Sequence, residues 1–341
     1  MKKILVLGGG GFIGRNIVEN LVNRGNCIVT AADIKEGSNW HKLSNKSKNF
    51  IPIIDDFTKM DAFKNFKNSF DEIYMLAAIV GVNKTLEFPE EVIRTNTLLT
   101  MNVLEWISKN PIKRLLFSSS SENYAGTSDI FGIDIPTDES VPMCIGDIKH
   151  PRWTYAMTKM HGESAFLHSS SSYNYECVIV RYQNIIGPEM GFGHAIPHIV
   201  QRFIEGEESP FKIYGHDQTR SFCYIDDAVN GTIGAMESNN TANEIYHIGK
   251  QEEINMEELT TYIGDLMNYS GEYEPAVTYP GSVSRRCPNI DKATKDYGYH
   301  PTVDWKTAVQ LTSEWYEEFF KSGKKPYSGG FISPENIIKK M

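Results

Sequence analysis

The chain is short of cysteine motifs and of long apolar runs. Its five cysteines are scattered over 341 residues without a Cys-x-x-Cys pair, which argues against a disulfide framework and fits reduced thiols. No apolar stretch approaches the roughly 20 residues that a membrane-spanning helix requires. The apolar run that follows Lys3 ends at Gly8, too early for a signal peptide. We therefore expect a cytoplasmic protein that does not associate with membranes.

Positive charge is also in short supply. The chain has 34 Lys and Arg against 43 Asp and Glu, a net charge of −9. A protein that binds nucleic acid needs a basic face that displaces counterions from the phosphate backbone. We therefore expect no nucleic-acid partner, and any anionic ligand must be held by a local site.

Hydrophobic residues make up 40% of the chain, and they are organised in an alternating pattern. Short β-rich runs alternate with helical stretches such as 91–108, which is typical of a parallel sheet covered by helices on both faces. The predicted strands are residues 3–7, 27–31, 50–54, 72–76, 114–118 and 177–181. The fold class predicted from this pattern is α/β.

The pattern changes after Asn184, where proline and glycine become frequent. We predict a first domain of residues 1–183, to which a helix and strand within 224–248 return. Residues 184–223 and 249–341 would form a smaller C-terminal α/β domain.

A glycine-rich turn directly follows the first predicted strand. Residues 8–14 read Gly-Gly-Gly-Gly-Phe-Ile-Gly and lead into a predicted helix, so backbone N–H groups and the positive helix end can approach a pyrophosphate. Asp33 ends the second predicted strand, where a carboxylate can accept both ribose hydroxyls and would repel a 2′-phosphate. This combination predicts a doubly wound, Rossmann-type domain that binds NAD.

A second constellation suggests catalysis. Tyr155 and Lys159 lie one helical turn apart, and a nearby ammonium would favour the phenolate form of the tyrosine. Ser118 to Glu122 follow a predicted strand at its carboxyl end, where open α/β sheets bind their ligands. A hydroxyl there could orient a substrate alcohol against Tyr155.

Together these motifs resemble the extended short-chain dehydrogenase/reductase superfamily, in its NAD-dependent nucleotide-sugar epimerase, dehydratase and decarboxylase branch. The resemblance covers nearly the whole chain and implies a nucleotide-diphosphate sugar as substrate. It implies cofactor contacts at Gly8, Gly11, Phe12, Ile13, Gly14, Asp33, Asp56, Phe57, Leu76, Ala77, Ala78, Asn96, Tyr155 and Lys159. The implied substrate ligands are Asn184, Arg220 and Arg286.

The resemblance also implies roles. Tyr155 would be the general base, Lys159 would hold the nicotinamide ribose, and Ser120 would bond a sugar hydroxyl while hydride passes from sugar C4 to NAD. Members of this family commonly pair through two helices, here 91–108 and 155–169, so we expect a homodimer.

The reaction that follows C4 oxidation depends on few residues. Ser121-Glu122 stands where dehydratases carry Asp-Glu, which counts against a 4,6-dehydratase. The same pair, the segment Pro151-Arg152-Trp153-x-Tyr155 and Arg286 resemble UDP-glucuronate decarboxylases, whereas Asn123 and residues 131–150 depart from them. We expect a 4-epimerase or 4-dehydrogenase, with a decarboxylase as the alternative.

Two further alternatives come from other classes. A non-catalytic Rossmann protein could sense dinucleotides, but it would not need Ser120, Tyr155 and Lys159 together. His194-x-x-x-His198 has the spacing of a metal-binding pair. Pro197 should disturb that turn and no acidic residue lies within it, so we expect no metal site.

Overall fold

A seven-stranded parallel sheet forms the larger part of the molecule. The computed structural model describes residues 1–206, 208–278, 282–326 and 334. The strands run in the order β10-β6-β5-β4-β1-β2-β3, and every neighbouring pair is parallel. The predicted α/β Rossmann-type fold is therefore confirmed. Their bounds are β1 Lys2–Leu7, β2 Cys27–Asp33, β3 Phe50–Ile54, β4 Glu72–Met75, β5 Arg114–Ser120, β6 Glu176–Tyr182 and β10 Glu244–Ile248.

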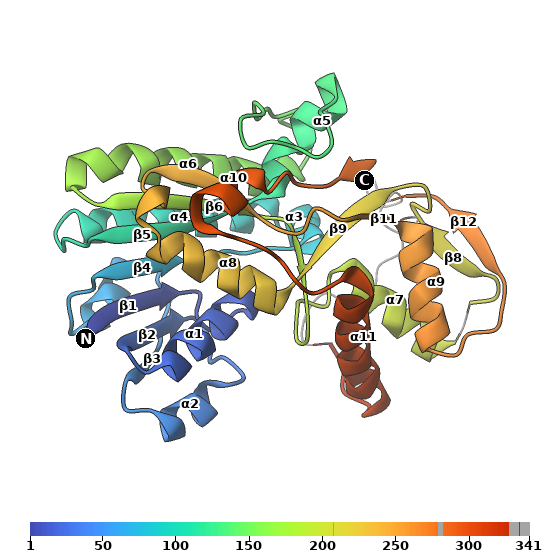
Figure 1. The fold of residues 1–341 in the computed structure, drawn as a ribbon, viewed down its shortest axis with the longest axis horizontal. Coiled ribbons are helices and arrows are strands. Elements are labelled where there is room, and N and C mark those ends of the chain that lie inside the picture. Colours follow the sequence, from blue (N-terminus) through green and yellow to red (C-terminus); the bar gives the residue numbers. More distant parts are fainter. Residues whose placement is uncertain (207, 279–281, 327–333, 335–341) are drawn as a thin grey trace.

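Helices cover both faces of this sheet (Figure 1). Successive side chains of a strand point to opposite faces, so Ile4 and Val6 of β1 join one core while Leu5 and Leu7 join the other. The first core also holds side chains of α1 (Phe12–Arg24), α2 (Trp40–Lys46), α8 (Ile225–Glu237) and α10 (Asp291–Tyr297). The second holds those of η1 (Met60–Asn65), α4 (Pro89–Ile107) and α6 (Trp153–Tyr173), and α3 (Val82–Glu87) packs against α4. Burial on both faces explains why these strands are continuous apolar runs.

The last strand of the sheet comes from far along the chain. The α8 helix and β10 are the helix and strand predicted within residues 224–248, and β10 pairs with β6 at the sheet edge. Ala293 of α10 and Tyr299 after it also join the core on the α1 and α8 face. The assignment of whole ranges to two domains stays a prediction, and residues 207, 279–281, 327–333 and 335–341 of the predicted second domain lie outside the described residues.

Smaller sheets and three helices lie beyond the carboxyl ends of the large sheet (Figure 1). One sheet has the order β11-β9-β13, and β7 also pairs with β9. These strands are short: β7 Asn184–Ile186, β9 Thr219–Tyr224, β11 Glu253–Asn255 and β13 Arg285–Arg286. A second sheet pairs β8 (Phe211–Tyr214) with β12 (Tyr273–Ala276). Their core is shared with α7 (Ala195–Glu205), α9 (Met256–Leu266) and α11 (Trp305–Lys321).

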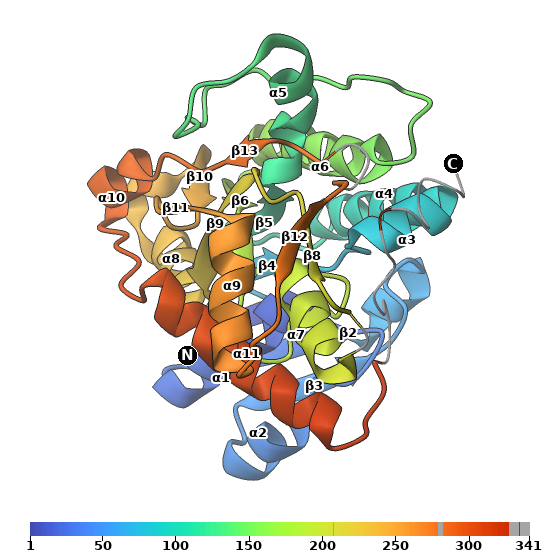
Figure 2. The same cartoon turned by 90° about the vertical axis from the view of Figure 1, so that its right-hand side faces the viewer.

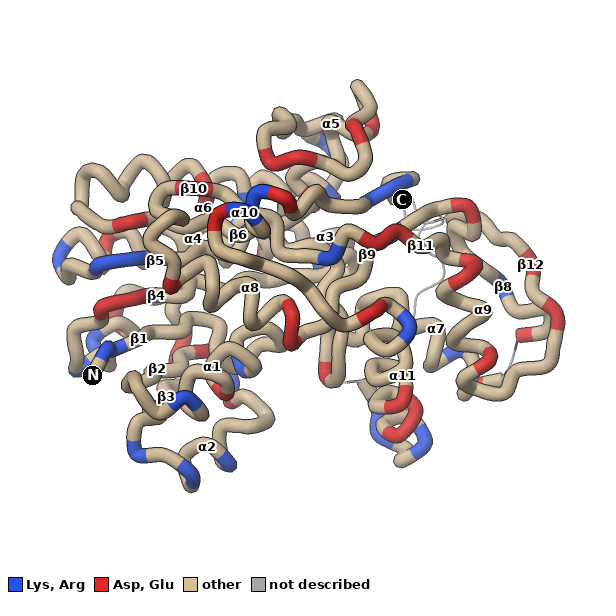
Figure 3. The backbone as a smooth tube through the Cα atoms, in the orientation of Figure 1, with Lys and Arg blue, Asp and Glu red and all other residues tan. Residues whose placement is uncertain are grey.

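One segment projects from the rest of the molecule. The short turn η2 (Ser121–Tyr124) continues into α5 (Ala125–Phe131), and α5 with the loop after it stands out at the top of Figure 2. Figure 3 shows acidic and basic residues interspersed over the large sheet, whereas acidic residues predominate along β11, α9 and β12. Within the described ranges, no helix is both long and apolar enough to cross a membrane.

Candidate active site

The glycine loop lies between the end of β1 and the start of α1. Gly8 has φ +86°, and a Cβ on it would lie 2.5 Å from the Ala77 backbone nitrogen, so the chain can pass there only without a side chain. A Cβ on Gly14 would lie 2.0 Å from the Gly8 carbonyl oxygen. The α1 helix begins at Phe12, which Ile13 follows. Gly11 is its N-cap residue, and no side chain caps the helix. Its first N–H groups are thus available to an anion.

Asp33 borders this loop at the carboxyl end of β2. Its Oδ2 accepts a hydrogen bond from Gly10 N at 3.0 Å. Burial raises the pKa of the Asp33 carboxyl, and the Gly10 N–H opposes that rise. A carboxylate next to a bare helix N-terminus suits a ribose beside a pyrophosphate, so the residues present fit a dinucleotide.

The segment after β4 forms the other wall of the loop. Leu76 N donates to Leu7 O at 2.8 Å, and Ala77 touches Gly8. Asn96, 5% exposed on α4, accepts from Ile79 N at 2.7 Å and donates to Ile79 O and to the Thr158 hydroxyl, both at 3.2 Å. Its amide is therefore committed to holding the segment that continues from Ala78 against α4 and α6.

Asp56 and Phe57 follow β3 at the same edge of the sheet, but their side chains are engaged elsewhere. The Asp56 carboxylate accepts from Thr58 N at 3.1 Å and from the Thr58 hydroxyl at 2.6 Å. The Phe57 ring is 4% exposed and stacks on Phe66 with 5.2 Å between ring centres. Only the position of this pair supports the predicted cofactor contact.

The hydroxyl groups and the lysine of the predicted catalytic set do come together. Tyr155 and Lys159 lie one turn apart on α6, with the Lys159 Nζ 5.7 Å from the centre of the Tyr155 ring. The Lys159 Nζ donates to Ser118 O at 2.7 Å. β5 runs two residues further than predicted and ends at Ser120, whose hydroxyl is hydrogen-bonded to that of Tyr155.

The expected effect of Lys159 on Tyr155 is not found in this structure. Burial raises the pKa of the Tyr155 phenol, and the hydrogen bond from Ser120 only partly opposes it. Burial also lowers the pKa of Lys159 to about 7, against the opposing charge of Glu163. The reason is that a dry environment disfavours both charged forms, and the sequence motif does not reveal this burial.

Glu122 lies between two arginines from distant parts of the chain. Its Oε1 accepts from Arg152 Nε at 2.8 Å and its Oε2 accepts from Arg286 Nη2 at 2.8 Å. Burial raises the pKa of Glu122, but the charges of Arg286 and Arg152 outweigh it, so that its pKa lies below the ordinary value. Ser121, Tyr124 and Arg286 also line a narrow pocket at this point.

A third guanidinium, that of Arg220 on β9, lies close to this group. Burial and the charge of Arg286 lower its pKa. Arg220 Nη2 donates to the Ser282 hydroxyl at 2.9 Å, and its other bonds are also to neutral groups. The Asn184 side-chain amide donates to Ser221 O at 2.9 Å, and Ser221 lies next to Arg220 on β9. The site thus gathers more positive charge than Glu122 balances, as an anionic ligand requires.

Three neighbours of this site have no role in the sequence analysis. The carboxylate of Glu163 forms a buried ion pair with Arg181 at 2.7 Å and also bonds the Ser119 hydroxyl. Glu163 lies one turn after Lys159 on α6, and Arg181 interrupts an apolar strand, which signals a buried partner. Asp129 adds a longer ion pair to Arg152, at 3.6 Å.

The histidine pair lies at the start of α7. His194 caps α7, and His198 falls in the helix itself. The expectation that Pro197 disturbs this turn is wrong, because Pro197 lies in the first turn, where backbone N–H groups have no helical partner. Among the residues that the structure describes, no group of three or more His, Cys, Asp or Glu side chains could hold a metal.

Comparisons with known proteins identify the family of the chain. A model of the NAD dependent epimerase/dehydratase family matches residues 4–249. A UDP-N-acetyl-alpha-D-glucosaminuronate decarboxylase of Bacillus cytotoxicus is 31% identical over 329 residues, which cover 93% of this chain and 98% of that protein. A UDP-glucuronate 4-epimerase of Thermodesulfobacterium geofontis is 28% identical and covers 92% and 96%.

A solved structure shares the fold. It is that of UDP-glucuronic acid 4-epimerase from Bacillus cereus in complex with UDP-glucuronic acid and NAD, with a TM-score of 0.79, 23% identity, and coverage of 93% of this chain and 99% of that one. The glycine loop, Asp33 and the match over most of the chain lead to one conclusion. The protein belongs to the NAD dependent epimerase/dehydratase family, with NAD as its cofactor.

Proposed function

We propose that this protein removes carbon dioxide from a UDP-linked hexuronate. The observation that carries the proposal is the Glu122 carboxylate held between Arg152 and Arg286, beside the hydroxyls of Ser120 and Tyr155. An enzyme that only inverts a hydroxyl does not need such a charged group next to its base. The 31% identity to a UDP-N-acetylglucosaminuronate decarboxylase supports the same reaction.

The chemistry of the substrate explains why C4 is oxidised first. A ketone at C4 turns the C5 carboxylate into that of a β-keto acid. When the bond between C5 and the carboxyl carbon breaks, its electron pair passes into an enolate, carbon dioxide leaves, and C5 takes up a proton. NAD, when bound, supplies the acceptor for the hydride of C4 and returns it at the end, so the overall reaction has no net oxidation.

The residues of β5 and α6 would handle the proton of the C4 hydroxyl. Tyr155 would take it up as general base, and Ser120, which already bonds the Tyr155 hydroxyl, would orient the sugar. Lys159 lies beneath them and is 4% exposed, where its charge can respond to the proton on Tyr155.

The arginines would hold the two anionic parts of the substrate. Arg220 would bind the diphosphate, since its guanidinium has only neutral partners. Arg286 and Arg152 would orient the carboxylate next to Glu122. A second negative charge there disfavours the carboxylate relative to neutral carbon dioxide, which promotes the break.

A 4-epimerase of UDP-linked uronates is the second candidate. It would use the same Ser120, Tyr155 and Lys159, and a relative with this activity is 28% identical. In that case the arginines would only bind the carboxylate. The ketosugar would rotate in the site, so that hydride returns to the opposite face of C4.

The test is the product formed from UDP-glucuronate and from UDP-N-acetylglucosaminuronate in the presence of NAD. We expect release of carbon dioxide and a product lighter by that mass. Glu122→Gln and Arg286→Gln should abolish the release, whereas Arg24→Gln should retain it, because Arg24 is exposed at the end of α1 and pairs with Glu237. An unchanged mass with an inverted C4 would favour the epimerase. A substrate unchanged by mass and by NMR would refute both.

A further inference from the structure

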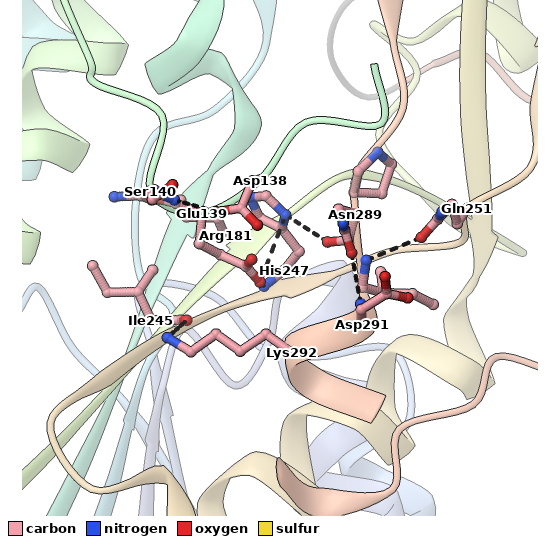
Figure 4. A network of polar contacts seen from close by, with 12 residues as sticks. Asp138, Glu139, Ser140, Arg181, Ile245, His247, Gln251, Asn289, Asp291 and Lys292 are labelled. Atoms are coloured by element: carbon pink, nitrogen blue, oxygen red, sulfur yellow. Dashed lines mark hydrogen bonds and ion pairs between the residues drawn. The ribbon is translucent and has the colours of Figure 1, made fainter. Parts of the chain in front are cut away.

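A buried histidine at the sheet edge connects the two chain segments that supply Glu122 and Arg286. His247 of β10 is fully buried, and Figure 4 shows it among Glu139, Arg181 and Asn289. Its Nε2 lies 2.8 Å from the Tyr124 hydroxyl, and its Nδ1 lies 2.9 Å from the Asn289 carbonyl oxygen. Its backbone N–H donates to Glu139 Oε1 at 2.8 Å.

When the imidazole is neutral, the donors and acceptors of these groups leave one arrangement. A carbonyl oxygen can only accept, so His247 Nδ1 carries the proton that goes to Asn289, and Nε2 must accept. Arg181 can only donate, and it donates to the Tyr124 oxygen. The Tyr124 O–H is therefore directed to His247 Nε2. Burial lowers the pKa of His247 to about 4, in keeping with this neutral imidazole.

This hydrogen-bond chain closes a ring through the candidate site. Tyr124 follows Glu122 by two residues within η2, and Asn289 follows Arg286 by three. Glu122 and Arg286 meet in the ion pair, while Tyr124 and Asn289 meet through His247. A segment that is joined at two points has little freedom to shift, so His247 limits how Arg286 can move relative to Glu122.

The loop after α5 is tied to the same segment. Thr137 N donates to Cys287 O at 2.8 Å, and Asn289 N donates to Thr137 O at 2.7 Å. Arg181 Nη1 also donates to Glu139 O at 3.0 Å. Thr137 and Tyr124 line the narrow pocket with Arg286, so the ties run along its wall.

We propose that His247 is a positioning residue that sets the geometry of the Glu122–Arg286 pair for loss of carbon dioxide. The inference rests on the proposed function. His247 touches neither member of the pair and acts through Tyr124 and Asn289. Its loss should therefore slow the step that uses the pair, and spare the C4 oxidation that depends on Ser120 and Tyr155.

The test compares His247→Leu and Tyr124→Phe with the wild type in a single turnover of UDP-glucuronate with NAD. Both variants should release carbon dioxide roughly 10- to 100-fold more slowly, the range that a small misplacement of reacting groups produces. The absorbance of reduced cofactor should rise and persist, because oxidation continues while the next step is slow. The affinity for UDP should stay within about twofold in both variants, because the contacts that Arg220 would make with the diphosphate are untouched.

Two further variants separate positioning from folding. His247→Asn can place an amide nitrogen near Nδ1 and restore the bond to Asn289, so it should recover part of the rate. Tyr246→Phe removes a hydrogen bond to Asp296 from the neighbouring residue on the opposite face of β10, at 2.9 Å, and should behave as wild type.

Each outcome decides between the possibilities. If oxidation and carbon dioxide release fall together, or if neither falls, His247 only stabilises the fold and the proposal is overturned. If the wild type oxidises UDP-glucuronate without releasing carbon dioxide, the proposed function fails. The positioning role is then tested by calorimetry. We expect His247→Leu to bind UDP-glucuronate more weakly than the wild type does, and to bind UDP as tightly. Equal affinities of the two proteins for UDP-glucuronate would overturn the role.

Discussion

Lys159 makes the stability of the protein depend on pH. Burial lowers its pKa to about 7, whereas in the unfolded chain it titrates near 10.5. Between these values the unfolded state binds more protons, so the free energy of unfolding should rise with pH from about 7 to 10.5. Urea unfolding of the protein and of Lys159→Met over this range measures the effect. The rise should be smaller in the variant, and equal slopes would contradict the prediction.

Asp33 should govern the choice between NAD and NADP. Its carboxylate stands at the end of β2 beside the glycine loop, where a 2′-phosphate would be repelled. Asp33→Asn should weaken NAD binding and improve the ratio of NADP to NAD affinity on the order of tenfold, or about 1.4 kcal/mol. Titration with each dinucleotide gives both constants. Glu36→Gln, an exposed neighbour, serves as the control and should keep the ratio of the wild type.

Single side chains could be predicted from the sequence where the motif is local. Ser120, Tyr155 and Lys159 belong to a strand end and to one helical turn, so their spacing was sufficient. The Glu122 pairs are different, since 30 and 164 residues separate Glu122 from Arg152 and Arg286. The predicted direction of the Tyr155 pKa shift was wrong for a related reason. The shift is set by burial, which is a property of the assembled fold.

At the scale of elements, Asn96 on α4 connects α4 with α6 and with the segment after β4. Its amide bonds both backbone groups of Ile79, after β4, and the Thr158 hydroxyl on α6. Asn96→Ala leaves buried polar groups unpaired and should lower the free energy of unfolding by roughly 2–4 kcal/mol. It should also weaken NAD binding, because the wall of the glycine loop loses its support. Asn96→Asp retains the acceptor for Ile79 N but turns a buried carboxylate oxygen towards Ile79 O, so it should lose at least as much stability. Unfolding curves with and without NAD distinguish the two effects.

Element prediction succeeded where burial was uniform. The strands of the large sheet are apolar because both faces are covered, and all six predicted ones are present. The two- and three-residue strands β13, β7 and β11 were not predicted, because their pairing is set by distant partners and not by local preference. The start of α7 before Pro197 was missed because a proline in a first turn looks like a helix breaker.

At the scale of the whole molecule, we expect a second copy to bind the outer face of α4 and α6. Ile93 and Met101 on α4 and Met157 on α6 are 36–49% exposed, although α4 and α6 pack against each other. Apolar side chains in neighbouring positions favour a symmetric contact. Ile93→Glu combined with Met101→Glu should convert a homodimer into a monomer in sedimentation equilibrium. Leu311→Glu, 40% exposed on α11, should not. A wild type that sediments as a monomer would contradict the prediction.

The place of β10 in the sheet has a consequence for how the chain is made. During synthesis β6 emerges well before β10, since more than 60 residues lie between the paired strands. Until the ribosome has added residue 248, the edge of β6 that pairs with β10 has no neighbouring strand. The Tyr124 hydroxyl also has no His247 to accept its hydrogen bond. A nascent chain released earlier would carry the complete glycine loop but an open edge, a template for pairing with other chains. Completion of the cofactor sheet is thus a late event in translation, and closure of the active site comes later still, because Arg286 and Asn289 follow β10 in the chain.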